Sequence, residues 1–221
     1  MLQSGMKFDA VLFDCDGVLV DSEHITNQVL RDMLDERGWR MNLQECMDVF
    51  LGKTVMDERV RIEQHTGQAL TPDWMDAFRA RRNAMLETHL QAIPNIGNAV
   101  RDVHALAQGR IACASGADRF KVELMLRKVG LHQYLDGRIF SGQEMPRNKP
   151  HPDVYLAAAK GLGVVAQRCA VVEDTLTGLA AGVAAGATVY AYVPCGSGQR
   201  FIDAGAHCVF TDMAHLPALL V

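Results

Sequence analysis

Phe13-Asp14-Cys15-Asp16-Gly17-Val18-Leu19-Val20-Asp21-Ser22-Glu23 follows an apolar run over residues 8–13 that only Asp9 interrupts. The run predicts a buried strand, and this strand ends in a carboxylate. In an open parallel sheet the carboxyl ends of the strands form the ligand crevice, so we expect Asp14 and Asp16 to share one pocket. Gly17 permits a sharp turn where a side chain would crowd the opening. The alternative is an ordinary solvated turn, because Asp and Gly are frequent turn formers.

The composition is that of a globular protein large enough to bury a core. Of the 221 residues, 49% are hydrophobic and 22% are charged, and the formal net charge is -4. Nucleic acids and anionic membranes bind basic surfaces, so neither is an expected partner. We find no apolar run of membrane-spanning length and no signal-peptide pattern, and therefore expect a cytoplasmic protein, either a monomer or a small homo-oligomer. Met6 leads directly into the first strand, which makes residues 1–5 a candidate dispensable extension.

The six cysteines are scattered without a CxxC pair or a regular spacing. Cys113 and Cys169 fall inside predicted strands, where a thiol packs as a small hydrophobic group. We expect reduced, structural cysteines rather than zinc ligands or disulfides. Cys15 lies between the two acids, and packing is its expected role.

The chain between residues 21 and 91 has a helical pattern throughout. Apolar residues recur at helical spacing after Ile25, and Gly38 ends that pattern. Thr71 and Pro72 form a cap and first-turn pair. The predicted helices cover residues 25–37, 43–50, 54–66 and 72–90.

From residue 93 onward, helices alternate with short apolar strands, which is typical of a parallel sheet. The predicted strands cover residues 111–114, 138–140, 170–172 and 188–192, and the strand at 8–13 belongs with them. Predicted helices cover residues 95–107, 118–129, 152–162 and 175–185. Residues 1–20 and 92–221 are therefore expected to form one α/β domain. The helical segment 21–91 is an insertion that can act as a lid.

Polar residues follow the later strands. Ser115-Gly116 comes after the strand at 111–114, and Glu173-Asp174 comes after the strand at 170–172. Lys149 precedes Pro150-His151-Pro152, whose prolines restrict the backbone. Each feature also has an ordinary explanation: a surface serine in a turn, a solvated lysine, and two acids that cap the next helix. Gly178, Gly182 and Gly186 recur at a spacing that predicts close packing of one helix face on the sheet.

Four short motifs resemble, in order and context, the four motifs of the haloacid dehalogenase superfamily. They contain Asp14 and Asp16, Ser115, Lys149, and Glu173 and Asp174. The helical insertion after the first motif resembles the cap of its beta-phosphoglucomutase-like branch. The resemblance implies an α/β fold, namely a Rossmann-like doubly wound parallel sheet with an inserted all-helical cap domain.

The resemblance also implies roles for these residues. Mg2+ would be bound by Asp14, Asp16 through its backbone carbonyl, and Asp174, with Glu173 as an additional or outer ligand. Asp14 would attack phosphorus to form an aspartyl-phosphate, and Asp16 would act as general acid and base. Ser115, Gly116 and Lys149 would hold the phosphate oxygens.

The identity of the second acid, Asp16, narrows the expected class of reaction. Haloacid dehalogenases usually have an aromatic residue in place of Asp16, and phosphonoacetaldehyde hydrolases have a small one, so Asp16 favours phosphate esters. The segment Phe50-Leu51-Gly52-Lys53-Thr54 is similar to the specificity loop of the branch. Val55 and Thr26 stand where beta-phosphoglucomutase has an arginine and a histidine, which favours a hydrolase over a mutase.

The sequence thus predicts a Mg2+-dependent phosphatase that acts on a small phosphorylated metabolite, a sugar phosphate being the expected class. Lys53 and Arg119 are the candidate substrate contacts, whereas the other cap arginines are more commonly solvated helix charges. Two alternatives remain open. One is a hexose phosphate mutase, and the other is a non-catalytic protein that binds a phosphorylated metabolite.

Overall fold

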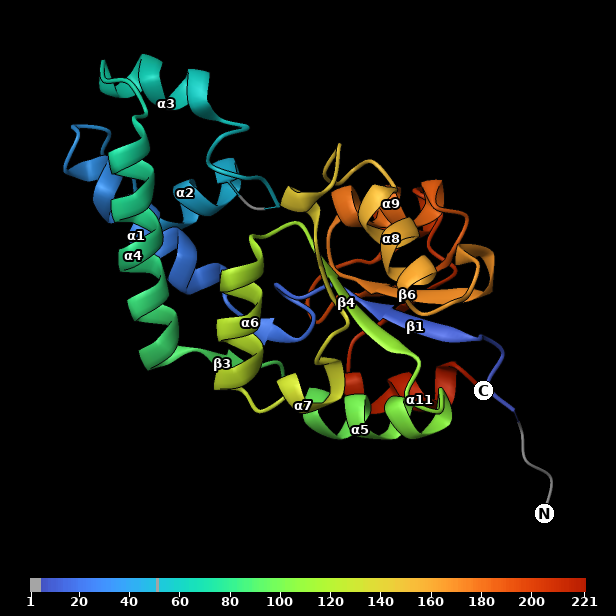
Figure 1. Ribbon diagram of the computed structural model, residues 1–221. Helices are drawn as coiled ribbons and strands as arrows, with labels where there is room; N and C mark the ends of the chain where they lie inside the picture. The colour runs from blue at the N-terminus through green and yellow to red at the C-terminus, as the bar shows by residue number, and fades with distance from the viewer. Residues whose placement is uncertain (1–4, 51) are drawn as a thin grey trace. The chain divides into compact units, whose positions relative to one another are not determined.

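The computed structural model describes residues 5–50 and 52–221. Contacts divide the chain into two compact units. The sheet unit contains Met1–Val20 and Ala92–Val221, and the helical unit contains Asp21–Gln91. The chain passes between them through two short strands that pair with each other, β2 (Val20–Asp21) and β3 (Gln91–Ala92) (Figure 1).

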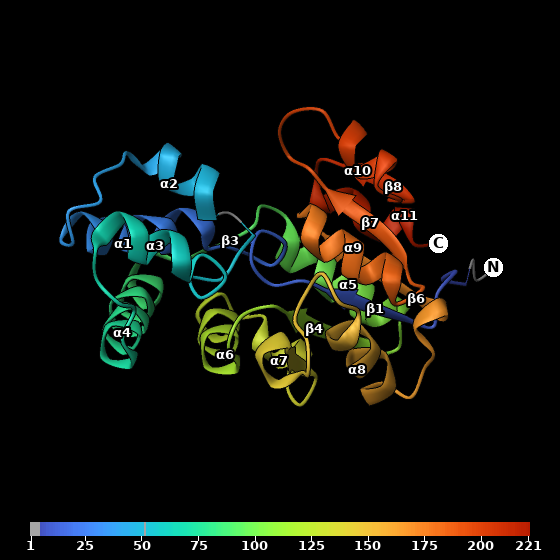
Figure 2. The same ribbon diagram turned by 90° about the horizontal axis from the view of Figure 1, so that it is seen from above.

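The sheet unit is built on a six-stranded sheet in the order β5-β4-β1-β6-β7-β8. Each described pair of neighbouring strands in it is parallel. Figure 2 shows β4 and β8 on opposite sides of β1. The strands are β1 (Ala10–Phe13), β4 (Ile111–Ser115), β5 (Ile139–Ser141), β6 (Cys169–Glu173), β7 (Thr188–Tyr192) and β8 (Cys208–Phe210).

Helices cover both faces of this sheet, so the predicted doubly wound α/β fold is confirmed. In Figure 1, α8 (Asp153–Gly161) and α9 (Leu176–Ala184) lie on one face, and α5 (Ile96–Leu106) and α11 (Leu216–Leu219) lie on the other. The unit also contains α6 (Arg119–Lys128), α7 (His132–Leu135) and α10 (Gln199–Asp203). Short 3-10 turns occur at Gly142–Glu144, Ala166–Arg168 and Met213–His215.

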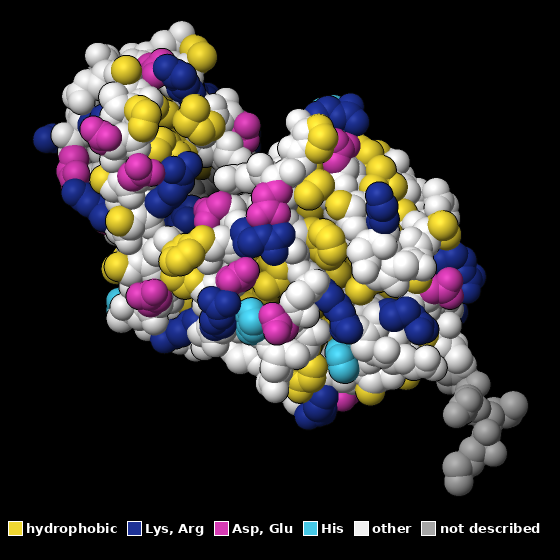
Figure 3. Space-filling model, viewed as in Figure 1, with side chains coloured by type: hydrophobic (Ala, Val, Ile, Leu, Met, Phe, Trp, Pro, Cys, Tyr) yellow, Lys and Arg dark blue, Asp and Glu magenta, His cyan; other side chains and the backbone are white. Residues whose placement is uncertain are grey.

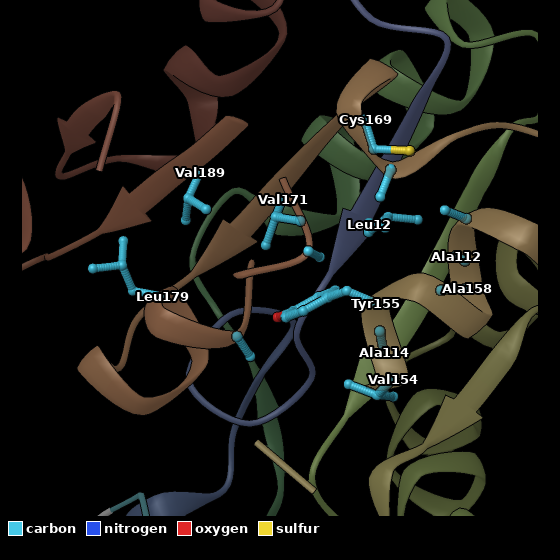
Figure 4. Close-up of a cluster of buried hydrophobic side chains, with 14 of the residues drawn as sticks. Leu12, Ala112, Ala114, Val154, Tyr155, Ala158, Cys169, Val171, Leu179 and Val189 are labelled. Carbon is cyan, nitrogen blue, oxygen red and sulfur yellow. The ribbon is translucent and has the colours of Figure 1, made fainter. Parts of the chain in front are cut away.

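The core under α8 and α9 fixes the positions of the central strands. Leu12 of β1 and Val171 of β6 are fully buried together with Tyr155 and Leu179. Figure 4 shows the Tyr155 ring of α8 among these side chains. Burial of each large apolar side chain contributes about 1.5–3 kcal/mol. Because β1 is buried throughout its length, the residue that follows it is held on a rigid support.

The helical unit contains α1 (Glu23–Asp35), α2 (Leu43–Phe50), α3 (Arg59–Thr66) and α4 (Pro72–His89). Its core is formed by side chains that include Leu30, Leu34, Phe50 and Phe78. The hydroxyl of Thr71 accepts a hydrogen bond from the backbone N–H of Trp74, which confirms the predicted cap of α4. The helices supply this unit with an apolar core of its own.

Several element boundaries differ from the sequence prediction. The helix predicted over 54–66 begins only at Arg59, because the backbone N–H groups of Asp57 and Arg59 donate to the carbonyls three residues earlier, in turns tighter than the α-helix. Gly186 lies beyond α9, with a φ of 80°, and so does not share a helix face with Gly178. Strand β8 and the short β2–β3 pair were not predicted, since their apolar runs are too short to recognise.

The surface carries mixed charge. Lys and Arg side chains alternate with Asp and Glu side chains over the face in Figure 3. Among the described residues, no helix combines the length and hydropathy that crossing a membrane requires. The six cysteines are free thiols, four of them buried.

Candidate active site

Three strands bring acidic and hydroxyl side chains to one edge of the sheet. Asp14 directly follows β1, Ser115 is the last residue of β4, and Glu173 is the last residue of β6. Strand β1 lies between β4 and β6, and all three are parallel. Their carboxyl ends therefore meet at the same edge, which is where open α/β sheets bind ligands. The structure thus brings together the motif residues that the sequence predicted.

Lys149 links the two strand-end acids. Its Nζ lies 2.6 Å from Asp14 Oδ1 and 2.7 Å from Glu173 Oε1. The same ammonium lies 4.7 Å from the centroid of the Tyr155 ring. Asp14, Glu173 and Tyr155 are buried and the Lys149 side chain is only 8% exposed, and a charge removed from water is tolerated only where it is paired and hydrogen-bonded. Lys149 is therefore held by its surroundings rather than free at the surface.

Glu173 is fully hydrogen-bonded by protein groups. Its Oε1 accepts from Lys149 and from the Tyr155 hydroxyl, the latter at 2.7 Å. Its Oε2 accepts from the backbone N–H of Asp174 and Thr175 and from the Thr175 hydroxyl. Thr175, rather than either acid, caps α9 by accepting from Gly178 N. The carboxylate of Glu173 thus holds Lys149 and the start of α9 in place.

Three carboxylates form a potential metal site. One oxygen from each of Asp14, Glu173 and Asp174 lies within 4.8 Å of the others. Oxygen ligands suit a hard divalent cation such as Mg2+. A Cβ on Gly17 would lie 2.0 Å from Asp174 Oδ2, so the absence of a side chain there leaves space for this carboxylate. The donor set therefore fits a hard cation, although protein groups already donate to both oxygens of Glu173.

Burial sets the protonation behaviour of Asp14. Desolvation raises the pKa of Asp14 to about 7, and the Lys149 ammonium opposes this increase. A carboxylate removed from water is a stronger nucleophile and a better ligand once a cation compensates its charge. Positive charge added beside Asp14 would therefore favour its ionised form near neutral pH.

Asp16 points to a different lysine. Lys121 of α6 places its Nζ 2.6 Å from Asp16 Oδ1, and the two side chains are 8% and 18% exposed. Sequence reasoning missed Lys121, because a lysine in the first turn of a helix, here the third residue of α6, is usually a solvated charge. No local pattern distinguishes it from its neighbours.

A second missed group supports the serine loop. Asn148 donates from Nδ2 to the carbonyl of Gly116 and accepts at Oδ1 from the backbone N–H of Lys149. The Ser141 hydroxyl donates to the carbonyl of Ala117 at 2.7 Å. The Ser115 Oγ accepts from Ala117 N at 3.1 Å. These contacts tie the loop after β4 to the loop that carries Lys149.

Gly178 adjoins the site as well as the sheet. A Cβ on Gly178 would lie 1.6 Å from Glu173 Oε1, whereas one on Gly182 would meet Val189 at 2.8 Å. The expected close packing on the sheet therefore holds for Gly182. At Gly178, the space instead accommodates the carboxylate that binds Lys149.

The candidate substrate contacts are engaged by nearby acids. Lys53 pairs with Glu58 within the helical unit, and Leu51 of the predicted specificity loop lies outside the described residues. Arg119 forms a two-pronged ion pair with Glu144, with both contacts at 2.6 Å. The side chain of Arg119 is 41% exposed. Substrate contact by Lys53 or Arg119 stays a prediction.

Comparison with known proteins agrees with this geometry. A haloacid dehalogenase-like hydrolase family model matches residues 8–186. A 6-phosphogluconate phosphatase from Escherichia coli (strain K12) is 27% identical over 215 residues, which span 96% of this chain and 95% of the relative. This relative and the family match support a phosphatase.

Solved structures share the fold over nearly the whole chain. A haloacid dehalogenase family hydrolase from Deinococcus radiodurans R1, with bound phosphate and sodium, is 36% identical with a TM-score of 0.77 and covers 97% of this chain and 96% of its own. A Thermotoga maritima protein assigned as a beta-phosphoglucomutase is 22% identical with a TM-score of 0.77, covers 96% of this chain and 97% of its own, and shows the fold alone. The match of the family model to most of the chain, together with the four motifs at one sheet edge, shows that this protein belongs to the haloacid dehalogenase-like hydrolases.

Proposed function

We propose that this protein is a Mg2+-dependent phosphatase that hydrolyses a small sugar phosphate through an aspartyl-phosphate on Asp14. The observation that carries the proposal is the meeting of Asp14, Lys149 and Glu173 in one buried network beside Asp174. Phosphate monoesters are anionic and hydrolyse slowly, so a catalyst must combine a nucleophile with compensating positive charge. The site offers both.

The proposed reaction has two steps. In the first, a carboxylate oxygen of Asp14 attacks phosphorus, the ester bond breaks, and Asp16 gives its proton to the leaving alkoxide. In the second, Asp16 takes a proton from water while the water oxygen attacks phosphorus. The bond to Asp14 then breaks, which releases inorganic phosphate and returns Asp16 to its protonated form. Two carboxylates on one turn therefore complete a hydrolysis without net proton change in the enzyme.

Asp14, Asp174 and the backbone carbonyl of Asp16 would hold Mg2+. When bound, the ion supplies charge neutralisation for the approach of one anion to another. Glu173 fits an outer position better than a direct one, because four protein groups already donate to its two oxygens besides the Asp174 backbone. Its role is to orient Lys149 beside Asp14.

Lys149 and Ser115 would bind the transferring phosphoryl group. A buried ammonium acts as a fixed positive charge, which stabilises oxygens that gain charge in the transition state. The hydroxyl of Ser115 and the backbone N–H of Gly116 lie on a loop that Asn148 ties to the Lys149 segment. The loop contacts thus keep the phosphate-binding groups in a constant relation to each other.

The substrate class rests on similarity. The Escherichia coli relative is named a 6-phosphogluconate phosphatase, and we transfer only the class, a small phosphorylated sugar derivative, to this chain. Lys53 and Arg119 remain the proposed contacts to the rest of the substrate. A cytoplasmic location, in keeping with a metabolite substrate, remains part of the proposal.

The decisive experiment compares Asp14→Asn with Asp9→Asn. Asp9 is an exposed carboxylate on the same segment that pairs with Arg168, so its variant controls for expression and purification. We expect phosphate release from a panel of sugar phosphates that requires Mg2+, survives in Asp9→Asn and falls to background in Asp14→Asn. Activity that persists in Asp14→Asn would refute the proposal.

A second assay separates hydrolysis from the mutase alternative. Beta-glucose 1-phosphate with a trace of sugar bisphosphate is incubated with the enzyme, and both products are measured. A phosphatase releases inorganic phosphate, whereas a mutase forms glucose 6-phosphate. Predominant glucose 6-phosphate formation would favour the mutase.

A further inference from the structure

Lys121 is a buried lysine near the site for which the four motifs provide no role. It belongs to α6, and the residue is 6% exposed. Its neighbour Arg119 pairs with Glu144, and Glu123 pairs with Arg127, so these charges of the helix have surface partners. The Lys121 ammonium instead meets Asp16 at 2.6 Å.

Burial of a lysine is costly unless the partner is well placed. The effective penalty for removing a charge from water is several kcal/mol, which a close, hydrogen-bonded opposite charge must offset. An apolar residue would fill this position of α6 at lower cost. The cation is therefore better explained by what it does to Asp16 than by packing.

Asp16 is a carboxylate that needs such support. It lies on the turn between β1 and β2, directly before Gly17, whose φ is 78°. Asp14 carries a like charge two residues earlier and is held by a separate cation, Lys149. Two lysines from different parts of the sheet unit thus contact the two acids: Lys149 contacts Asp14 as well as Glu173, and Lys121 contacts Asp16.

We propose that Lys121 is a positioning residue that holds the Asp16 side chain in the orientation from which its carboxylic acid gives a proton to the leaving group and its carboxylate takes one from water. The inference rests on the proposed function, in which Asp16 is the general acid and base. Both residues belong to the sheet unit, so the contact needs no side chain from residues 21–91.

A double-mutant cycle tests this inference. The variants are Lys121→Met, Asp16→Asn and their combination, with Lys128→Met as the control, because Lys128 is an exposed lysine on the same helix. Proton transfer by a positioned group contributes typically about 10²–10⁴-fold, so we expect Asp16→Asn to lower kcat by that factor. Lys121→Met should lower kcat by a smaller factor, about 10- to 100-fold, with KM changed less than about 3-fold.

The combination decides between positioning and an independent role. If Lys121 acts through Asp16, the double variant has the kcat of Asp16→Asn within about 3-fold, because residues that act as a unit are not additive. Lys121→Arg, which keeps the charge, should recover part of the activity. Lys128→Met should match the wild type.

Three results would overturn the inference: a double variant whose loss equals the product of the single losses, a Lys121→Met kcat equal to that of Lys128→Met, or a Lys121→Arg variant no better than Lys121→Met. If Lys121→Met fails to fold, the comparison of Asp16→Asn with the double variant still applies, since the amide oxygen introduced at position 16 can accept from Lys121 and the double variant contains neither charge. Failure of the proposed function is distinct, because it appears as wild-type activity that does not depend on Asp14.

Discussion

The hydroxyl of Tyr155 offers a quantitative test of the buried network. It donates to Glu173 Oε1 at 2.7 Å, and both residues are fully buried. Burial raises the pKa of Tyr155 well above its usual value, so the phenol remains a proton donor at neutral pH. Tyr155→Phe removes this donor and keeps the ring that α8 places in the core against the sheet. Hydrogen bonds to charged groups contribute about 1.5–3 kcal/mol, which is the expected loss in the free energy of unfolding.

Tyr190→Phe is the matched control. The Tyr190 side chain is also buried in the sheet unit, but its hydroxyl donates to the neutral carbonyl of Leu219 at the longer distance of 3.3 Å. We therefore expect a loss of only about 0.5–1 kcal/mol there. Urea unfolding followed by circular dichroism measures both variants against the wild type. A cost for Tyr155→Phe no larger than that for Tyr190→Phe would refute the argument that Glu173 is held as a buried charged acceptor.

Two further predictions follow from the glycine at the turn and from a surface ion pair. Gly17→Ala should weaken Mg2+ binding at least about 10-fold, the loss typical of a disturbed ligand shell, because its Cβ would meet Asp174 Oδ2 at 2.0 Å. Gly38→Ala is the control, because Gly38 has a similar positive φ but open space around the added Cβ. Calorimetric titration with Mg2+ should show weaker binding for Gly17→Ala and unchanged binding for Gly38→Ala. The Arg119 guanidinium holds the pKa of Glu144 in the folded protein below its usual value. The ion pair therefore stabilises the fold at pH values above the pKa that Glu144 has in the unfolded chain. This stabilisation is lost as the pH falls through the lower pKa that Glu144 has in the folded protein. Wild type should exceed Glu144→Gln in unfolding free energy by up to about 1 kcal/mol at pH 7 and by nothing in strong acid, and an equal difference at both pH values would contradict this.

The central strands and most helices could be predicted because their signals are local. Residues 111–114 and 170–172 are continuous apolar runs, residues 188–192 are apolar after Thr188, and each run forms the predicted strand within one residue at either end. The late start of α3 could not be predicted, because the backbone of residues 54–59 forms turns with bonds to the carbonyl three residues earlier, and the apolar spacing does not distinguish these from an α-helix. Strand β8 has only three residues and is only partly buried, so its sequence shows neither an apolar run nor an alternation long enough to predict a strand.

Some residues of the candidate site could likewise be predicted from the sequence, and others could not. Asp14, Ser115, Lys149 and Glu173 could be found from sequence, since each stands at a strand end or in a restricted loop whose position the pattern shows. Lys121, Tyr155 and Asn148 could not be found, because their partners lie 105, 18 and 32 residues away in the chain. Their residue types are ordinary for a helix or a loop.

The sequence by itself determined the alternation of strands and helices, the place of the helical insertion and the four motif residues, because these depend on periodicity and on neighbours along the chain. Only the tertiary structure decided which cation serves which acid. Lys149 pairs with Asp14 and Glu173, and Lys121 pairs with Asp16, since parallel strands bring together groups that are distant in sequence. The opening turn supplies two carboxylates, and the packing of α6 and of the Lys149 loop against the sheet edge determines how each one is held.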